Sequence, residues 1–292
     1  MLFGIIALSG AGLLWCLEGV CYEWIPAKPN AVRLNMLTGA VFSNLLLWTL
    51  FCPGMASARE IAIVAAFLLP AGIAYLLSVA VLKKAMENGS AGSAWCIMQA
   101  AMICPLLTMV IFFGEKMTPF SSLGILSLFA GLSLFGVTRN APSTSVSNHH
   151  WKFIIWASLA FLLTGLQQTC AMLPSKIAGL SENALSWRVP LMKFSTMLWL
   201  VPCIAARCRP RRREWIFGVC FGVVSSGGEL LFFLGVDHLN RFNLAGLTYP
   251  LALSISIVLF TFYCRFYRQR KFSKVELAAI GTTVLGILML SC

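Results

Sequence analysis

Residues 90–137 read SAGSAWCIMQAAMICPLLTMVIFFGEKMTPFSSLGILSLFAGLSLFGV, and this stretch indicates how the whole chain is built. An apolar run of about membrane-spanning length is followed by a polar turn at 114–119 and by a second apolar run that contains glycines. A similar pattern recurs 154 residues later in the sequence. This shift superposes Arg59-Glu60 on Arg213-Glu214, Ala91-Gly92 on Ala245-Gly246, and Trp95 on Tyr249. Chance similarity between two apolar sequences is the alternative, but the matches favour two related halves.

The composition indicates that most of the chain is surrounded by lipid and not by water. Hydrophobic residues make up 59% of the 292 residues and charged residues only 11%, with a mean hydropathy of +0.84. A soluble protein of this size needs a polar exterior and could not bury so much apolar surface. The apolar residues also fall in blocks long enough for a helix to cross a bilayer. The sequence therefore predicts an all-α, multi-pass protein of the cell (inner or plasma) membrane, surrounded by lipid.

Ten transmembrane helices are expected from these blocks. Their ranges are 3–22, 31–51, 61–82, 92–113, 120–138, 153–171, 186–205, 215–235, 244–264 and 275–291. Residues 1–140 form the first five-helix repeat, residues 141–151 a polar linker, and residues 152–292 the second repeat. Because five is odd, the second half enters the membrane from the opposite side. This arrangement predicts an inverted-topology repeat, which is typical of secondary transporters.

Cysteine and histidine usage argues against disulfide, metal or cofactor chemistry. The eleven cysteines lie mostly inside apolar blocks without a CxxC pair, and the three histidines are expected in loops. Small buried packing residues are the expected role of the cysteines. The sequence also has no P-loop of the type that binds ATP. We expect no metal, no cofactor and no enzymatic activity.

Several stretches together resemble one family. Pro105, the turn Gly114-Glu115-Lys116-Met117-Thr118 and the later Ala245-Gly246-Leu247-Thr248-Tyr249-Pro250 are similar to the EamA-like ten-helix branch of the drug/metabolite transporter superfamily. The resemblance covers essentially the whole chain. It implies an importer or exporter of amino acids, sugars, nucleotide sugars or other small metabolites that works without ATP. The second Gly-Glu turn of the family is replaced here by Tyr267-Arg268-Gln269-Arg270-Lys271, so Glu115 is expected to be structural.

Basic residues predict the orientation in the membrane. Four of them lie in expected loops on the side of the termini, and fifteen lie on the opposite side. The positive-inside rule then places both termini outside the cell. Relatives in the resembled family are instead drawn with cytoplasmic termini, so the two arguments disagree. The net charge of +12 is explained by loops that face anionic lipid, without nucleic acid as a partner.

Polar groups inside apolar helices are the candidates for substrate binding and coupling, because charges at membrane depth are costly. Arg33 and Arg188 lie in a first turn and are expected to reach the interface, whereas the other charged groups lie deeper. Superposition of the halves places Gln167 and Gln168 where Glu18 lies. The candidate site residues are Glu18, Asn35, Trp95, Gln99, Gln167, Gln168, Lys193, Glu229 and Tyr249. For the aromatic ones, ordinary packing is an equally good interpretation.

Three charged candidates each have two possible roles. Glu18 is either a protonatable group of a transport pathway or the ion-pair partner of Arg33. At a rise of 1.5 Å per residue, Lys193 lies roughly 10 Å and Glu229 about 9 Å below the same surface. We therefore expect these two residues to face a central cavity and to pair. The pair is either exchanged for substrate during transport or a permanent salt bridge that fixes helix packing.

The function that fits these features best is secondary active transport of a small polar metabolite by alternating access, with protons as a candidate coupling ion. Buried groups of both signs suit a zwitterion, such as an amino acid or a related compound. Amide and aromatic side chains also suit a sugar or nucleotide-sugar carrier, which is the alternative. A membrane-embedded enzyme or a channel belongs to a different class, and neither has its expected motif here. The substrate, the direction of transport and the choice between monomer and homodimer stay open.

Overall fold

The computed structural model describes the backbone of residues 2–24, 29–50, 53–89, 91–113, 119–137, 147–177, 179–205, 207, 212–240, 248–269 and 272–289. Every regular element in these ranges is a helix. The elements are α1 (Leu2–Trp24), α2 (Pro29–Leu50), α3 (Ala58–Asn88), α4 (Ala91–Gln99), η1 (Ala100–Met102), α5 (Ile103–Phe113), α6 (Pro119–Val137), α7 (Ser147–Met172), η2 (Leu173–Lys176), α8 (Glu182–Leu185), α9 (Arg188–Thr196), η3 (Met197–Trp199), α10 (Leu200–Ala205), α11 (Arg212–Asn240), α12 (Thr248–Phe266) and α13 (Lys274–Met289).

Prolines account for two differences from the expected helices. The helix expected over 92–113 is divided into α4, the 3₁₀ turn η1 and α5. Pro105 has no N–H for the carbonyl of Ala101, which lies in that turn. The helix expected over 186–205 is divided into α9, η3 and α10. There Pro202 leaves the carbonyl of Leu198 without its usual partner.

Polar ends account for three further corrections. α3 continues to Asn88 instead of ending at Leu82, and α11 extends beyond both ends of the expected 215–235. α7 begins at Ser147, inside the expected linker. All three histidines therefore lie in helices instead of loops: His149 and His150 in α7, and His238 in the last turn of α11. An apolar window stops at the first charged residues, whereas the backbone hydrogen bonds of a helix continue past them. The expected start of a helix at 244 and the turn at 114–118 lie outside the described residues.

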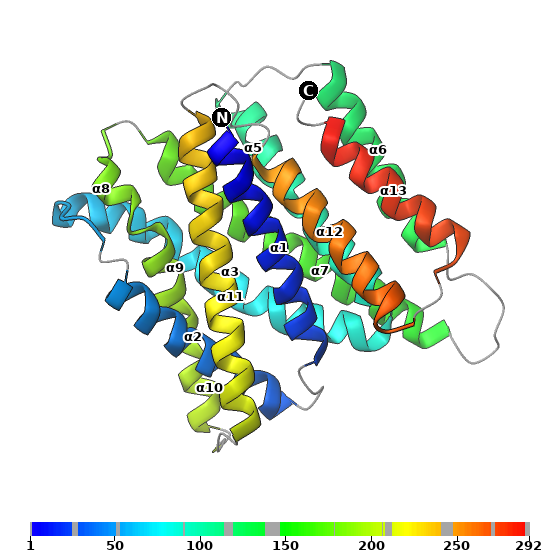
Figure 1. Ribbon diagram of the computed structural model, residues 1–292, viewed down its shortest axis with the longest axis horizontal. Helices are drawn as coiled ribbons and strands as arrows, with labels where there is room; N and C mark the ends of the chain where they lie inside the picture. The colour runs from blue at the N-terminus through cyan, green and yellow to red at the C-terminus, as the bar shows by residue number, and fades with distance from the viewer. Residues whose placement is uncertain are drawn as a thin grey trace.

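The helices form one bundle in which segments from both halves of the chain alternate (Figure 1). α1 packs on α11 and α12, α3 packs on α7 and α9, and α2 packs on α11. α4 lies between α7 and α12, and α6 pairs with α13 at one edge of the bundle. α1 begins and α13 ends on the same side, at the top of Figure 1.

Glycines bring α2 and α11 into backbone contact. A β-carbon added to Gly218 would lie 1.7 Å from Oγ1 of Thr38 and 3.1 Å from the backbone nitrogen of Gly39. One added to Gly222 would lie 2.6 Å from the carbonyl oxygen of Gly39. Ser43 also donates a hydrogen bond of 3.1 Å to the carbonyl of Gly222. Small residues and a hydroxyl group thus hold this glycine contact together, as in many membrane helix pairs.

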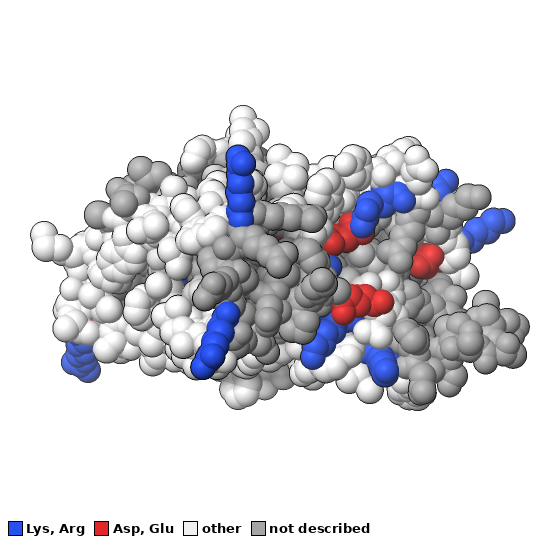
Figure 2. All heavy atoms as spheres, turned by 90° about the horizontal axis from the view of Figure 1, so that it is seen from below, with Lys and Arg blue, Asp and Glu red and all other residues white. Residues whose placement is uncertain are grey.

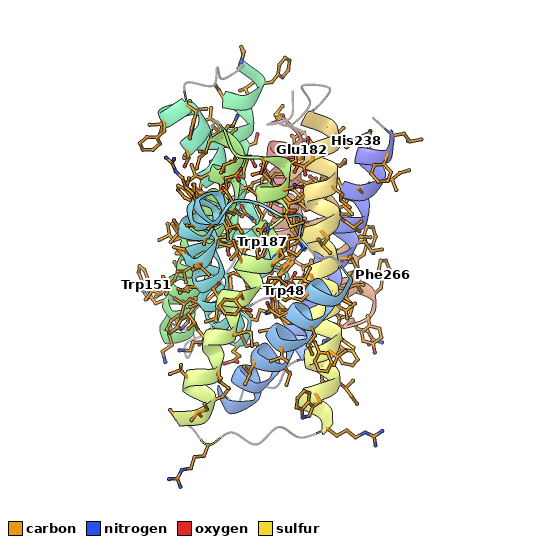
Figure 3. All side chains as sticks on the ribbon, turned by 90° about the vertical axis from the view of Figure 1, so that its left-hand side faces the viewer. Trp48, Trp151, Glu182, Trp187, His238 and Phe266 are labelled. Carbon is orange, nitrogen blue, oxygen red and sulfur yellow. The ribbon has the colours of Figure 1, made fainter. Side chains whose placement is uncertain are left out.

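The outer surface of the bundle is apolar along much of its length. Figure 3 shows large side chains directed away from the helices, and among them Trp48, Trp151 and Phe266 are 41%, 65% and 71% exposed. Five described helical stretches are long and apolar enough to cross a membrane: Leu2–Trp24, Ala58–Asn88, Ala91–Phe113, Trp151–Lys176 and Trp215–Leu239. Exposed apolar surface of this extent is unfavourable in water and favourable in lipid. These features agree with the predicted membrane location.

Candidate substrate site

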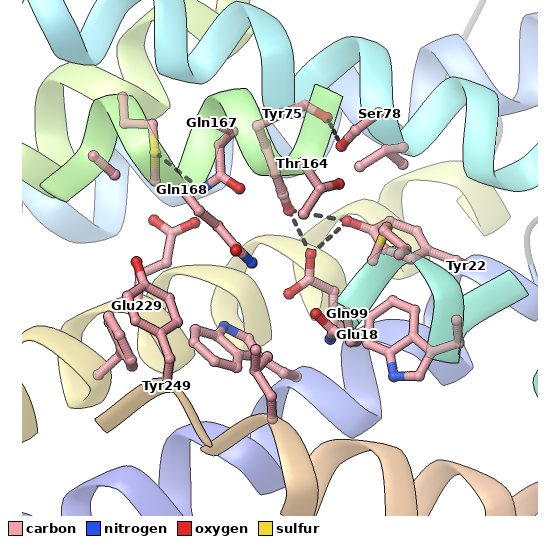
Figure 4. A pocket seen from close by; sticks show the side chains of 18 of the residues that line it. Glu18, Tyr22, Tyr75, Ser78, Gln99, Thr164, Gln167, Gln168, Glu229 and Tyr249 are labelled. Atoms are coloured by element: carbon pink, nitrogen blue, oxygen red, sulfur yellow. Dashed lines mark hydrogen bonds between the residues drawn. The ribbon is translucent and has the colours of Figure 1, made fainter. Parts of the chain in front are cut away.

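A cavity of about 70 Å³ lies in the middle of the bundle, between α1, α3, α4, α7, α9, α11 and α12 (Figure 4). Its wall combines carboxylates, amides, hydroxyls and aromatic rings, which is unusual inside an apolar bundle. The lining residues are Trp15, Glu18, Tyr22, Tyr75, Ser78, Val79, Trp95, Met98, Gln99, Thr164, Gln167, Gln168, Ala171, Met192, Glu229, Phe232, Phe233, Tyr249 and Leu253. A space of this volume holds a few water molecules.

The structure brings most of the candidate site residues from the sequence to this one cavity. The lining includes Glu18, Trp95, Gln99, Gln167, Gln168, Glu229 and Tyr249. Lys193 is not part of the lining but lies directly behind it, with its side chain 2% exposed. The side chain of Asn35 lies outside the described residues, and so does that of Arg33, the alternative partner of Glu18.

Glu18 is held by two phenol groups. The hydroxyl of Tyr75 on α3 donates a hydrogen bond of 2.5 Å to Oε1 of Glu18, and the hydroxyl of Tyr22 donates to the same oxygen. Tyr22 follows Glu18 by one turn of α1, so both side chains point to the same side of the helix. Within the described residues, the partners of this carboxyl group are therefore neutral hydroxyls from two helices.

Lys193 and Glu229 form the ion pair that the depth argument predicted. Nζ of Lys193 lies 2.8 Å from Oε1 of Glu229, and both residues are buried. The same Nζ donates to Oγ of Ser225 at 2.8 Å and lies 4.5 Å from the centre of the Tyr75 ring. The predicted pairing is confirmed. Whether the pair is exchanged for substrate or only fixes the packing stays a matter for experiment.

A continuous hydrogen-bonded chain connects the two carboxylates. Lys193 donates to Oγ of Ser225, which lies 2.7 Å from the Tyr75 hydroxyl, and that hydroxyl donates to Glu18. Glu229 joins the chain through Lys193. Lys193 donates to Ser225 and Tyr75 donates to Glu18, so the hydroxyl of Ser225 donates to Tyr75. The three bonds from Lys193 to Glu18 then point toward Glu18, whereas the bond from Lys193 to Glu229 points the other way. Buried networks of this kind polarise along their length, so its ends are electrostatically coupled.

Three residues of the cavity wall each have a buried polar atom without a hydrogen-bond partner among the described residues. The atoms are Oε2 of Glu229, Oε1 of Gln168 and Oγ1 of Thr164. All three residues are at most 6% exposed. Figure 4 shows Gln168 projecting between Glu18 and Glu229. Buried polar atoms normally find a partner, so unpaired ones on a cavity wall mark places where a ligand or a water molecule binds.

Five aromatic side chains of the cavity were missed by sequence reasoning, which had named only Trp95 and Tyr249. Tyr22, Tyr75, Trp15, Phe232 and Phe233 line the cavity, and none of them was among the candidates. The spacing of Tyr22 from Glu18, one helical turn, was an available signal. Tyr75 had none, because its contact with Glu18 spans 57 positions of the sequence. Aromatic residues are common in apolar helices, so the ones that reach a cavity cannot be recognised without the helix packing.

Arg188 was expected to reach the membrane interface, and this expectation is wrong. Arg188 is only 3% exposed, and Cζ of its guanidinium group lies 4.2 Å from the centre of the Phe233 ring. It pairs with Asp237 at 3.1 Å and donates to Oγ of Ser175 at 3.0 Å. The side chain of Asp237 is 56% exposed. The arginine therefore remains buried, and a carboxylate at the rim compensates its charge.

A second hollow of about 380 Å³ opens on the face where α1, α3 and α12 end. Acidic and basic side chains gather on this face (Figure 2), and Glu23, Lys83, Glu87 and Arg268 line the hollow. Arg268 pairs with Glu23 at 3.0 Å, and the hydrogen bond and negative charge of Glu23 raise the pKa of Arg268 above its usual value. Lys83 donates to the last carbonyl groups of α1, at residues 22 and 23. These contacts fasten the ends of three helices together.

Aromatic rings from α1 and α12 pack around Trp95 of α4. The ring centre of Trp95 lies 6.1 Å from that of Tyr22 and 5.5 Å from that of Phe260. Along α4, Ala91 lines the hollow and Trp95, one turn later, lines the cavity. The cavity and the hollow are thus one helical turn of α4 apart.

Comparisons with known proteins concern the fold only. No family model and no curated protein matches the sequence. Among solved structures, 27 chains match this one. One of them, described only as "Crystal structure of protein", aligns over 98% of this chain and 95% of its own, with a TM-score of 0.59 and 14% sequence identity. The chain is therefore similar in fold to a solved protein over almost the full length of both.

Proposed function

We propose that the protein is a secondary active transporter of a small polar metabolite, an amino acid or a related compound, across the cell membrane. The observation that carries the proposal is the central cavity, where Glu18 and Glu229 are buried inside an apolar bundle and joined by a hydrogen-bonded chain. Charged groups at such a depth are costly and are retained where they bind a substrate or a coupling ion. Alternating access would expose the cavity to one side of the membrane at a time.

The proposal includes ten membrane spans arranged as two inverted repeats, as in the EamA-like transporters that the sequence resembles. Helix packing supports it. If α1, α3 and α4–α5 of the first half correspond to α7, α11 and α12 of the second, each contact has a counterpart. The contact of α1 with α11 corresponds to that of α7 with α3, and the contact of α1 with α12 to that of α7 with α4–α5. Both members of each pair of contacts are present, as a two-fold relation between the halves requires.

The cavity wall supports the same relation. Tyr75 and Glu229 are 154 positions apart, as are Trp95 and Tyr249, and all four line the cavity. Residues that correspond under the repeat therefore meet at one place near the middle of the bundle. Substrate sites of transporters with inverted repeats lie at such an interface between the halves.

Protons are the coupling ion that the site suits best. Glu18, Glu229 and Lys193 together carry one negative charge when all three groups are ionised. A proton bound to one of the carboxylates would neutralise this charge. A sugar carrier is the second candidate, because the three amides of Gln99, Gln167 and Gln168 line the cavity together with aromatic rings. Amides and flat apolar rings are the groups that bind hydroxyl-rich ligands.

Reconstitution into liposomes tests the proposal. The protein should catalyse saturable counterflow of a labelled amino acid, amine or sugar, and a proton gradient should drive net uptake. Glu182→Gln, at an exposed position of α8 that does not line the cavity, serves as the control and should transport normally. Flux that never saturates would indicate a channel, and chemical conversion of the ligand would indicate an enzyme.

A further inference from the structure

The chemical groups on the cavity wall indicate which kind of substrate it accepts. We propose that the cavity binds the primary ammonium group of an organic monocation between Glu18 and Glu229, and that it rejects the carboxylate of an amino acid. This inference rests on the transport function proposed above and narrows its substrate from amino acids and related compounds to amines. The argument uses charge balance, unpaired acceptors and the aromatic wall.

Among the side chains that the structure describes, charge balance leaves one carboxylate of the cavity without a cation. Lys193 is bonded to Glu229, and the described partners of Glu18 are the phenol groups of Tyr22 and Tyr75. The three ionisable groups therefore sum to one negative charge when they are all ionised. A buried charge without a counter-charge is unfavourable, so the cavity favours a ligand that carries one positive charge.

The unpaired atoms of the wall are mainly hydrogen-bond acceptors. Oε2 of Glu229 and Oε1 of Gln168 can only accept, and both are buried without a partner. A primary ammonium group has three N–H donors, which these two oxygens and the Glu18 carboxylate can accept. A quaternary ammonium group carries the same charge but has no N–H, and it would leave the buried oxygens unpaired.

Among the described residues of this wall, a carboxylate finds no free cation. The described cations nearest the cavity are Lys193, which donates to Ser225 and Glu229, and Arg188, which is bonded to Asp237. The ring of Phe233, which lines the cavity, lies against the Arg188 guanidinium group. A substrate carboxylate would instead face two glutamates of the same charge. Like charges in a buried site are strongly unfavourable.

Aromatic rings complete a site for a cation with an apolar body. Trp15, Tyr22, Trp95, Phe232 and Tyr249 line the cavity beside the two carboxylates. Ring faces attract a cation and pack against hydrocarbon. The volume of about 70 Å³ is small beside the roughly 300–1,000 Å³ of common ligand pockets, which favours short substrates.

Thermal unfolding of the purified full-length protein tests the inference with matched ligands. The amines are isobutylamine and 2-phenylethylamine, and L-valine and L-phenylalanine add only a carboxylate to them. Isobutanol removes the charge, and N,N,N-trimethylisobutylammonium removes the N–H donors. At least one amine at saturation should raise the unfolding midpoint by about 4 °C or more. The corresponding amino acid, alcohol and quaternary ion should each raise it by less than about 1 °C.

Variants locate the binding. Glu18→Gln should weaken amine binding at least about tenfold, since it removes the unpaired negative charge. Glu182→Gln should leave amine binding unchanged. Equal stabilisation by the amine and its amino acid, or by the quaternary ion, would overturn the inference. So would the absence of a shift with either amine. If Glu18→Gln does not fold, the ligand series on the unaltered protein still decides.

Flux measurements separate this inference from the transport proposal. Counterflow of an amino acid without binding of its amine would overturn the ammonium site and leave the transporter function standing. Amine binding that depends on Glu18, without counterflow of any tested compound, would support the site and refute transport. Counterflow of labelled isobutylamine or 2-phenylethylamine that Glu18→Gln abolishes would support both.

Discussion

The hydroxyl group of Tyr75 donates a hydrogen bond of 2.5 Å to the carboxyl group of Glu18 and so joins α3 to α1 at the central cavity. The same hydroxyl lies 2.7 Å from Ser225, which accepts from Lys193. One phenol thus connects Glu18 to the ion pair of Lys193 with Glu229. A change of charge or ligand at either carboxylate is expected to reach the other through this group.

Removal of that hydroxyl should uncouple the two carboxylates. Tyr75→Phe leaves the ring in place but takes a hydrogen bond from Glu18 and another from Ser225, both of which are buried. We expect a loss of about 1–3 kcal/mol in the free energy of unfolding, together with slower transport. Tyr267→Phe, at a residue that is 64% exposed, is the control and should change little. Equal unfolding curves for Tyr75→Phe and the unaltered protein would contradict the expectation.

A charge swap distinguishes the two roles of the Lys193–Glu229 pair. Lys193→Glu combined with Glu229→Lys keeps one buried ion pair but places its carboxylate behind the cavity wall. We expect the doubly substituted protein to fold and to lose transport, because the cavity would then carry an ammonium group in place of the carboxylate of Glu229. Counterflow in liposomes measures the effect. Transport at the unaltered rate and affinity would show that the pair serves packing alone.

Glu18 should determine the pH dependence of transport if it carries the coupling proton. The side chain of Glu18→Gln cannot take up or release the proton, so whatever substrate exchange the variant retains at high substrate concentration should not respond to an imposed pH gradient. Uptake at several external pH values, measured in liposomes, provides the comparison. A variant with normal rates and an unchanged pH profile would exclude the coupling role.

The orientation in the membrane follows from the distribution of basic residues. If this bias governs insertion, the termini lie outside and the loop at 207–213 lies in the cytoplasm. A C-terminal reporter that is active only in the cytoplasm should then be silent, and one inserted in that loop should be active. An active C-terminal fusion would reverse the assignment and agree with the resembled family instead.

Two glycine substitutions test the helix packing. Gly218→Ala would place a β-carbon 1.7 Å from Oγ1 of Thr38 and should force α2 and α11 apart, at a cost of about 1–3 kcal/mol. Gly281→Ala, inside α13, meets nothing within 4 Å and should be neutral or stabilise by about 0.4–1 kcal/mol. Thermal unfolding of both variants in the same detergent measures the difference. Similar midpoints would argue against the close contact.

The sequence predicted the parts of the site whose residue types are rare in apolar helices. A charge or an amide in such a run is conspicuous, and Glu18, Gln168 and Glu229 were found for that reason. Their depth along the helices was also sufficient to predict that Lys193 and Glu229 pair. Residue type gave no such signal for Tyr75, because only the packing of α3 against its neighbours places it at the cavity. Arg188 was misjudged because its partner, Asp237, lies 49 positions away in the sequence.

Helix boundaries were predicted where polarity and backbone geometry agree. Hydropathy identified α1 and α13 within two residues of their observed ends. It could not show that α3 continues beyond Lys83 and Lys84, since charged side chains leave helical hydrogen bonding intact. Nor could it show which proline interrupts a helix: Pro70 lies inside the uninterrupted α3, whereas Pro105 follows the 3₁₀ turn η1. Neighbouring helices decide whether the free carbonyl is accommodated.

The glycine contact between α2 and α11 has a mechanical consequence. Gly218 and Gly222 of α11 present no side chain to α2, and the ring of Phe221 lies against Gly39, so a small sliding movement would carry this ring across a surface without a side chain. The hydroxyl of Ser43 could exchange its bond to one carbonyl group for a bond to the next. Small displacements of packed helices are one of the two common ways in which domains open and close. We therefore expect α2 and α11 to slide past each other at this glycine contact when the cavity turns from one side of the membrane to the other.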